Sequence, residues 1–217
     1  MTRAKSDQAY LPAAGRDVFL PFYDPLVRLL GFDRLRMVLL EQATLRPGDR
    51  VLDVGCGTGT LAVLVKRLYP SVDVVGLDPD PRALERARRK AERAGVSVRF
   101  DLGFADALGY PDATFDRVFS SMMFHHLGEE TKDAALLEAR RVLKPGGRLE
   151  FLDFAGHGPH GHGILAHLIH AHGMLREHVD GRIQERMARA GFVEPRKVRE
   201  KGTLFGRLGF FQASVPR

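Results

Sequence analysis

A glycine-rich turn between an apolar run and a helical pattern constrains this chain more than any other feature of its sequence. Val51–Val54, apolar except for one acid, predicts a short buried strand of the parallel-sheet kind. Gly55, Gly57 and Gly59 follow at once, and a helical pattern begins near Thr60. Glycine lets the chain bend sharply and removes the Cβ that would hold a ligand away. The free N–H groups at a helix N-terminus favour an anionic group. The turn is therefore predicted to hold a ligand.

Three interpretations of this turn compete. It could be an ordinary strand-to-helix turn, although three alternating glycines are more than such a turn needs. It also satisfies the dinucleotide pattern G-x-G-x-x-G/A through Gly57, Gly59 and Ala62. Asp53, two residues before the first glycine, separates the options. Its carboxylate would repel a pyrophosphate but would attract a ligand that carries an ammonium or a sulfonium.

Strand and helix patterns alternate after the turn. Further strands are predicted at 72–78, 96–100, 115–121 and 148–154, and helices at 60–69, 81–94 and 129–143. Asp80 is expected to cap the second of these helices, with Gly95 just past its end. Two final strands near 193–201 and 208–215 are predicted to form an antiparallel hairpin at the sheet edge. The fold class is therefore α/β, a Rossmann-like, doubly wound, mostly parallel seven-stranded sheet with its ligand crevice at the carboxyl ends of the strands.

Acids follow two of the predicted strands. Asp78 ends the second strand, 19 residues after the last glycine of the turn, where a carboxylate can bind the hydroxyls of an adenosine ribose. A purely capping role is the alternative, but Asp80 fills that role better. Asp106 follows the third strand, where it can accept a hydrogen bond from the adenine amine while Phe104 or Ala105 flanks the ring.

Four sequence blocks in order carry a resemblance to a known family. Residues 53–59 read D-V-G-C-G-T-G, Asp106 follows, residues 110–118 are close to P-x-x-x-F-D-x-V, and residues 141–147 match R-x-L-K-P-G-G. Over roughly residues 45–155 the chain resembles class I S-adenosylmethionine-dependent methyltransferases. It is closest to the small-molecule enzymes of ubiquinone/menaquinone biosynthesis and to the phosphatidylethanolamine N-methyltransferase-like group.

The resemblance implies in-line transfer of the sulfonium methyl of S-adenosylmethionine to a small-molecule acceptor, which leaves S-adenosylhomocysteine. It also implies that residues 1–45 form an N-terminal helical cap over the active site and that residues 46–217 form the cofactor-binding domain, in one compact unit. The implied cofactor site contains Asp53, Gly55, Cys56, Gly57, Gly59, Asp78, Pro79, Phe104, Ala105, Asp106 and Ser121. The alternatives are an NAD(P)-dependent oxidoreductase and a non-catalytic S-adenosylmethionine-binding protein.

Candidate catalytic residues lie beside this site. His125 and His126 come just after the fourth strand, close to where a transferable methyl would be. One or both, with His126 as the first candidate, could act as a general base if the acceptor must lose a proton. Packing is the alternative for at least one of them. Within the predicted cap, Tyr23 is the candidate for a polar contact in the active site. The alternative is that its ring packs between helices. Seven further histidines lie between His157 and His178, but without paired cysteines or an H-E-x-x-H spacing no metal site is expected.

Charge and composition limit the partners. Lys and Arg number 33 against 27 Asp and Glu, a net charge of +6 spread along helices. This predicts solvated helix faces and no nucleic-acid partner, and it allows a weak association with an anionic membrane surface. No apolar run approaches the roughly 20 residues that span a bilayer. With Cys56 as its single cysteine the chain can form no internal disulfide. We expect a cytoplasmic monomer or homodimer.

Overall fold

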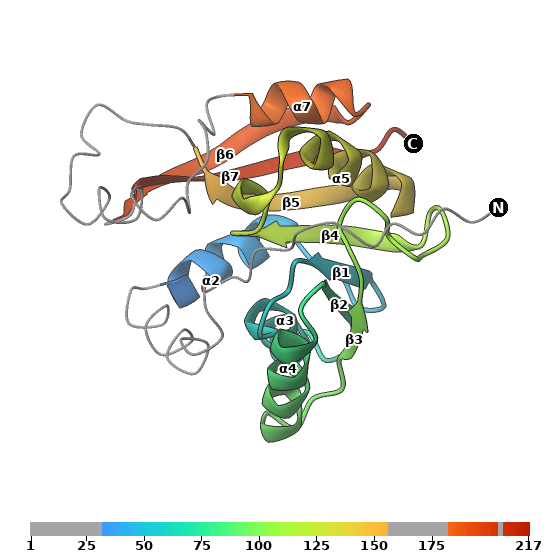
Figure 1. Cartoon of the computed structure of the whole chain (residues 1–217), viewed down its shortest axis with the longest axis vertical. Helices are drawn as coiled ribbons and strands as arrows, with labels where there is room; N and C mark the ends of the chain where they lie inside the picture. Colours follow the sequence, from blue (N-terminus) through green and yellow to red (C-terminus); the bar gives the residue numbers. More distant parts are fainter. Residues whose placement is uncertain (1–31, 156–181, 204–205) are drawn as a thin grey trace.

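The computed structural model describes residues 32–155, 182–203 and 206–217 (Figure 1). In chain order the elements are α2 (Phe32–Ala43), β1 (Arg50–Val54), α3 (Thr60–Leu68), β2 (Asp73–Asp78), α4 (Pro81–Arg93), β3 (Arg99–Leu102), β4 (Phe115–Ser121), the 3-10 helix η2 (Phe124–His126), α5 (Glu129–Val142), β5 (Leu143–Phe154), α7 (Ile183–Arg189), β6 (Val193–Thr203) and β7 (Gly206–Ser214).

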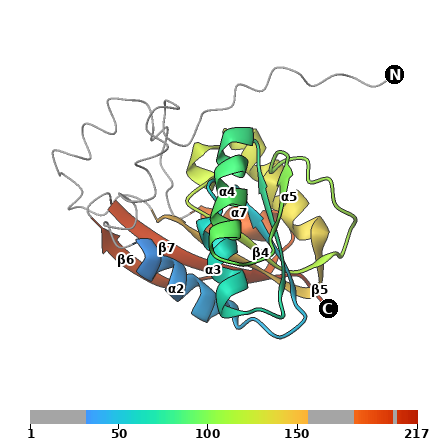
Figure 2. The same ribbon diagram turned by 90° about the horizontal axis from the view of Figure 1, so that it is seen from below.

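The strands form one seven-stranded sheet in the order β3-β2-β1-β4-β5-β7-β6. Strands β1 to β5 are parallel to one another, whereas β7 runs antiparallel to β5 and β6 antiparallel to β7. Helices cover both faces: α2, α3 and α4 lie on one, in front of the sheet in Figure 2, and α5 and α7 on the other. The predicted fold class, with its C-terminal hairpin at the sheet edge, is confirmed.

Alternation along the buried strands divides the core between the two faces. Val51 packs with the α2, α3 and α4 side, whereas Leu52 and Val54 pack with the α5 and α7 side. By the same alternation Asp53 belongs to the face of Val51. An acid at this position is therefore buried under the helices that come after the glycine turn.

Two strand boundaries differ from the prediction. The third strand was predicted at 96–100 but begins at Arg99, because the N–H of Val96 bonds back to Ala91 O and closes the end of α4. The chain then pairs with β2 only from Arg99 onward. The fifth strand begins at Leu143, which pairs with Phe115, and not at residue 148. The pairing of β4 with β5 shifts register between Phe115 and Arg117, so the K-P-G-G segment forms an irregularity within β5.

The predicted cap is described only from Phe32 onward. Helix α2 packs against β5. Near its end the side-chain Nε2 of Gln42 donates to Glu150 Oε2 at 2.8 Å and to Phe211 O at 3.0 Å. Helix α2 therefore belongs to the layer of helices that covers one face of the sheet. Residues 1–31, the larger part of the predicted cap, lie outside the described residues. Among the described helices, none is both long and apolar enough to cross a membrane.

Candidate functional site

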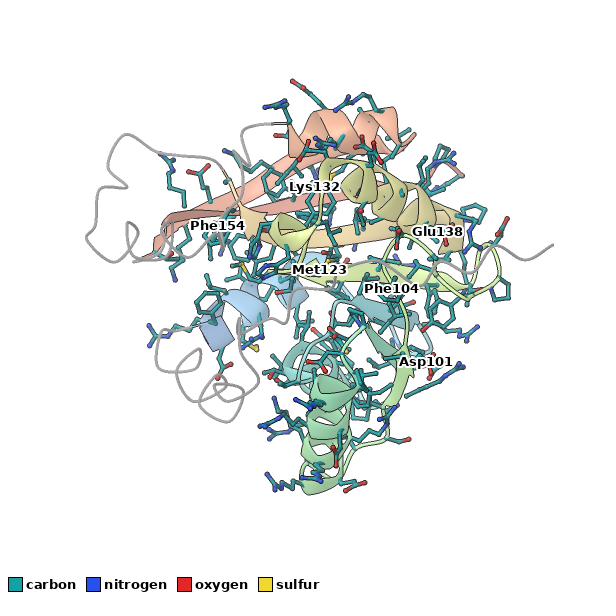
Figure 3. All side chains as sticks on the ribbon, in the orientation of Figure 1. Asp101, Phe104, Met123, Lys132, Glu138 and Phe154 are labelled. Carbon is teal, nitrogen blue, oxygen red and sulfur yellow. The ribbon has the colours of Figure 1, made fainter. Side chains whose placement is uncertain are left out.

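The parallel strands bring the predicted residues to one edge of the sheet. The glycine turn leaves the carboxyl end of β1, Asp78 ends β2, residues 104–106 follow β3, and η2 follows β4. Because β1 lies between β2 and β4, these segments converge around the turn. Figure 3 shows Met123 and Phe154 at the carboxyl ends of β4 and β5. Four segments far apart in the chain thus share one site.

The three glycines of the turn are required for different reasons. All have positive φ, at 71° for Gly55, 52° for Gly57 and 73° for Gly59. A Cβ on Gly55 would lie 2.2 Å from Met123 Cγ, and one on Gly59 would lie 3.0 Å from the Phe100 ring. A Cβ on Gly57 would meet no atom within 4 Å. Among the described residues, the turn therefore leaves open space beside its backbone at Gly57, while its ends are tightly packed.

Asp78 fixes this turn to the end of β2. Its Oδ2 accepts a hydrogen bond from Gly57 N at 2.8 Å, and its Oδ1 accepts one from Asp80 N at 2.9 Å. The side chain is buried, and burial raises the pKa of this carboxyl. Asp80 caps α4 as predicted, since its Oδ1 accepts from Arg82 N. A carboxylate has about four acceptor positions, so Asp78 can hold the turn and still accept from a ligand hydroxyl.

Asp53 has the most unusual environment in the site. It is 2% exposed, and its Oδ2 has no hydrogen-bond partner among the described residues. Burial raises its pKa from 3.8 to about 7; Arg36 opposes this rise, the charge of Asp78 adds to it, and the N–H of Ala62 opposes it. A buried carboxylate oxygen without a donor is costly unless a ligand supplies one. The ammonium of S-adenosylmethionine is such a donor, so the residues present fit that ligand.

The other predicted cofactor residues differ in what they expose. Cys56 is buried, with its Sγ 2.9 Å from where a Cβ on Gly76 would lie, and burial raises the pKa of its thiol. Its side chain therefore packs in the core, and only its backbone belongs to the turn. Phe104 is 43% exposed, so part of its side chain is available to a ligand. The remaining predicted residues are half-buried: Pro79, Ala105, Asp106 and Ser121.

The two predicted catalytic histidines lie side by side on η2. Their ring centroids are 4.0 Å apart. His125 Nδ1 lies 2.7 Å from Asp153 Oδ1 near the end of β5. Burial lowers the pKa of His126 to about 4, helped by the charge of His125 and opposed by that of Asp153. His126 is therefore neutral at neutral pH and a weak base.

Other predicted residues are not described. Tyr23 and the histidines from His157 to His178 lie outside the described residues. Within the described ranges, no group of three or more His, Cys, Asp or Glu side chains could hold a metal ion.

Sequence reasoning missed Asp153 and Met123. Asp153 had a detectable signal, because Phe151-Leu152-Asp153-Phe154 repeats the pattern of Val51-Leu52-Asp53-Val54, an acid near the end of an apolar strand. Met123 had none. It covers Gly55 because Met122 has a positive φ of 57°, a backbone turn that its residue type does not indicate.

Comparison with known proteins identifies the family. Residues 51–147 match the family model described as a methyltransferase domain. With the glycine turn, the buried acid and the strand order already described, this match decides the assignment. Residues 51–147 are a class I S-adenosylmethionine-dependent methyltransferase domain.

Curated relatives of this methyltransferase domain are named for different substrates. The chain is 44% identical over 137 residues to the demethylmenaquinone methyltransferase of Thermus thermophilus, which covers 62% of this chain and 61% of the relative. It is 40% identical over 123 residues to the 27-O-demethylrifamycin SV methyltransferase of Amycolatopsis mediterranei, over 56% of this chain and 44% of the relative. The chain thus spans less than two thirds of the length of either relative.

A solved structure has the same fold. The apo form of the S-adenosylmethionine-dependent methyltransferase SibL superposes with a TM-score of 0.73 at 26% sequence identity. The match covers 95% of this chain and 61% of SibL. The likeness therefore extends beyond residues 51–147 to nearly the whole chain.

Proposed function

We propose that this chain transfers the methyl group of S-adenosylmethionine to a small-molecule acceptor. The observation that carries the proposal is the buried Asp53 Oδ2 without a partner among the described residues, at the edge where Gly57 leaves open space. The bound cofactor supplies a methyl group already activated on a sulfonium, so the protein mainly positions donor and acceptor. Well-oriented proximity of this kind contributes about 7–11 kcal/mol to lowering a barrier.

Each acid in the site has one proposed partner. Asp53 would bind the ammonium of the cofactor, and Asp78 the ribose hydroxyls. Asp106 would accept from the adenine amine, with Phe104 against the ring. Gly57 would let the methionyl part approach the backbone of the turn. Gly55, Cys56 and Gly59 would shape that turn, and Pro79, Ala105 and Ser121 would complete its walls.

The acceptor is proposed to bind between this edge and residues 1–45, with Tyr23 as a polar contact from the cap. The names of the relatives favour a small molecule, because one is named for demethylmenaquinone and the other for demethylrifamycin SV. A nucleic acid is not proposed as a partner, since the net charge of +6 is spread along the chain. A reducing compartment such as the cytoplasm suits a single buried cysteine.

Calorimetry tests the donor site. We expect S-adenosylmethionine and S-adenosylhomocysteine to bind and NAD(H) not to bind. Gly57→Ala and Gly95→Ala form a matched pair, because both residues have positive φ and a Cβ on either would meet nothing within 4 Å. Both variants should lose about 1 kcal/mol of stability, but only Gly57→Ala should weaken S-adenosylhomocysteine binding. Absence of binding by both S-adenosyl ligands would overturn the proposal.

Turnover tests the choice between an enzyme and a binding protein. Release of S-adenosylhomocysteine is followed with a panel of small acceptors that includes reduced demethylmenaquinone. Methylation of any member supports the enzyme. Tight cofactor binding with no turnover across the panel would favour the non-catalytic alternative.

A further inference from the structure

A histidine and a buried carboxylate meet at the carboxyl ends of β4 and β5. His125 Nδ1 and Asp153 Oδ1 are 2.7 Å apart, with side chains 8% and 0% exposed. The two residues are 28 positions apart in sequence: His125 lies on η2, just after β4, and Asp153 lies near the end of β5, the neighbouring parallel strand. Met123, two residues before His125, packs against Gly55 of the glycine turn. The pair therefore lies at the edge of the sheet that carries the proposed donor site.

Asp153 is held rigidly by backbone groups. Its Oδ2 accepts from Phe124 N at 3.0 Å, and its Oδ1 accepts from Phe154 N at 2.8 Å. Burial by itself would raise the pKa of Asp153, but the charge and hydrogen bond of His125 and the N–H of Phe154 lower it below its usual value. The carboxylate is thus charged at neutral pH. A charged acceptor at this distance fixes both the orientation and the tautomer of the imidazole.

The tautomer determines what His125 can do. A carboxylate accepts hydrogen bonds, so Nδ1 must carry the proton and donate it toward Asp153. The lone pair is then on Nε2. Ring contacts fix the imidazole further, since the His126 ring lies tilted against it, with centroids 4.0 Å apart, and the Phe154 ring meets it edge-on at 4.9 Å. In its neutral form the ring therefore offers a proton-accepting nitrogen, with a carboxylate behind it to stabilise the imidazolium that forms.

We propose that His125 is the catalytic base that removes a proton from an ionisable hydroxyl of the methyl acceptor, and that Asp153 is its positioning residue. This inference rests on the proposed methyl transfer. In the step, the hydroxyl proton passes to Nε2 of His125. The electron pair of the oxygen, or of a ring carbon conjugated with it, forms the bond to the methyl carbon. The bond from that carbon to sulfur breaks and its electron pair stays on sulfur, and the imidazolium later returns the proton to water.

The pair also narrows the acceptor class. A hydroxyl is a poor nucleophile until it loses its proton, so a base accelerates its methylation. A thioether or a tertiary amine has no such proton, and a preformed base would serve no purpose there. The acceptor is therefore a phenol, an enol or a hydroquinone. His126 does not replace His125, since burial lowers the pKa of His126 to about 4 and no carboxylate hydrogen bond to its ring is seen among the described residues.

The test separates positioning from folding. In Asp153→Asn the amide oxygen can still accept from a backbone N–H, while the amide NH2 can donate to Nδ1 of His125 and move the imidazole proton to Nε2. The matched control is Glu150→Gln, also fully buried on β5 but on the opposite face. His125→Gln removes the base itself. Nitrogen-15 NMR of the histidine side chains reports the tautomer without any acceptor, and calorimetry with S-adenosylhomocysteine reports the donor site.

We expect the wild-type His125 to be protonated at Nδ1, Asp153→Asn to reverse this, and Glu150→Gln to leave it unchanged. With reduced demethylmenaquinone or another acceptor that turns over, kcat should fall about 100-fold or more in His125→Gln and in Asp153→Asn. The double variant should be no slower than His125→Gln, because the carboxylate acts through the imidazole. The KM of the acceptor and the Kd of S-adenosylhomocysteine should change less than about twofold in either variant.

Two results would overturn the inference: a wild-type His125 protonated at Nε2, or a wild-type kcat in His125→Gln. If S-adenosylhomocysteine binds in either case, the proposed function stands and only the base is wrong. If no panel member is methylated, the tautomer alone decides. Failure of S-adenosylhomocysteine to bind would instead count against the proposed function.

Discussion

Replacing Asp53 by asparagine should stabilise the protein and weaken its binding of the cofactor. The carboxyl is fully buried, with Oδ2 unpartnered among the described residues, and its pKa rises from 3.8 to about 7. At 1.36 kcal/mol per pKa unit, keeping this group ionised in the folded state costs about 4 kcal/mol above pH 7. The asparagine NH2 needs a partner of its own, which costs about 1–3 kcal/mol. We expect a net gain of about 1–3 kcal/mol at pH 8.

The raised pKa of Asp53 determines how the stability of the wild type changes with pH. Below about pH 4 Asp53 is protonated in both the folded and the unfolded chain, so it favours neither. Between pH 4 and pH 7 the unfolded chain loses the proton first, and the wild type loses stability as the pH rises. The difference in unfolding free energy between Asp53→Asn and wild type should therefore grow over this window and level off above pH 7. Urea unfolding at pH 4.5, 6 and 8 measures it.

Binding should change in the opposite direction. Loss of a charged hydrogen bond to the ligand ammonium costs about 1.5–3 kcal/mol, or about 10- to 100-fold in the Kd of S-adenosylhomocysteine at pH 8. Wild-type affinity should weaken as the pH falls from 8 to 5 and Asp53 becomes protonated, whereas Asp53→Asn should show a flat profile. A variant that is less stable than wild type at pH 8, or that binds S-adenosylhomocysteine with wild-type affinity, would refute the reasoning.

Other substitutions test the supports of the site. Asp78→Ala removes the acceptor for two backbone N–H groups and should cost about 1–3 kcal/mol in urea unfolding as well as S-adenosylhomocysteine affinity, whereas Asp80→Ala removes only a helix cap and should cost about 1 kcal/mol with affinity unchanged. Gly59→Ala drives a Cβ against Phe100 at positive φ; it should cost about 2–4 kcal/mol, and a wild-type thermal midpoint would contradict this packing. Arg141→Ala removes the hydrogen bonds from the guanidinium to the carbonyls of residues 108 and 110. We expect the free energy of unfolding, measured by denaturant titration, to fall by about 1–3 kcal/mol. A smaller loss would mean that the loop at 108–110 is stable without these hydrogen bonds.

Local patterns were enough to predict most of the fold. The strand Phe115–Ser121 was predicted with the bounds that the structure shows, because its apolar residues follow a segment of turn residues at 111–114. The glycine turn and the Asp80 cap are equally local signals. The start of β5 was wrong because Leu143 pairs with Phe115 across a register shift, and no short-range pattern specifies such pairing.

The chemistry of the site was less predictable than its location. The sequence placed Asp53 beside the turn, but only burial by several distant elements makes its pKa unusual. It also brought His125 and His126 to this edge, with His126 as the first candidate for the base, but it could not distinguish their surroundings. That distinction depends on Asp153, which reaches His125 only because β5 pairs with β4. A role that arises from a contact between two strands cannot be predicted from the sequence of either strand alone.

The strand order divides the molecule into two parts that can change separately. Three adjacent strands, β3, β2 and β1, lead into the segments proposed to hold the donor, whereas β4 and β5 on the other side carry the histidine and aspartate at their ends. The two sides meet where Met123 packs on Gly55 of the glycine turn. A lineage could keep the same methyl donor while exchanging the segments beyond residue 123, and so acquire new products from an unchanged supply of methyl groups. For the engineer, the boundary between β1 and β4 is the place to join two such enzymes.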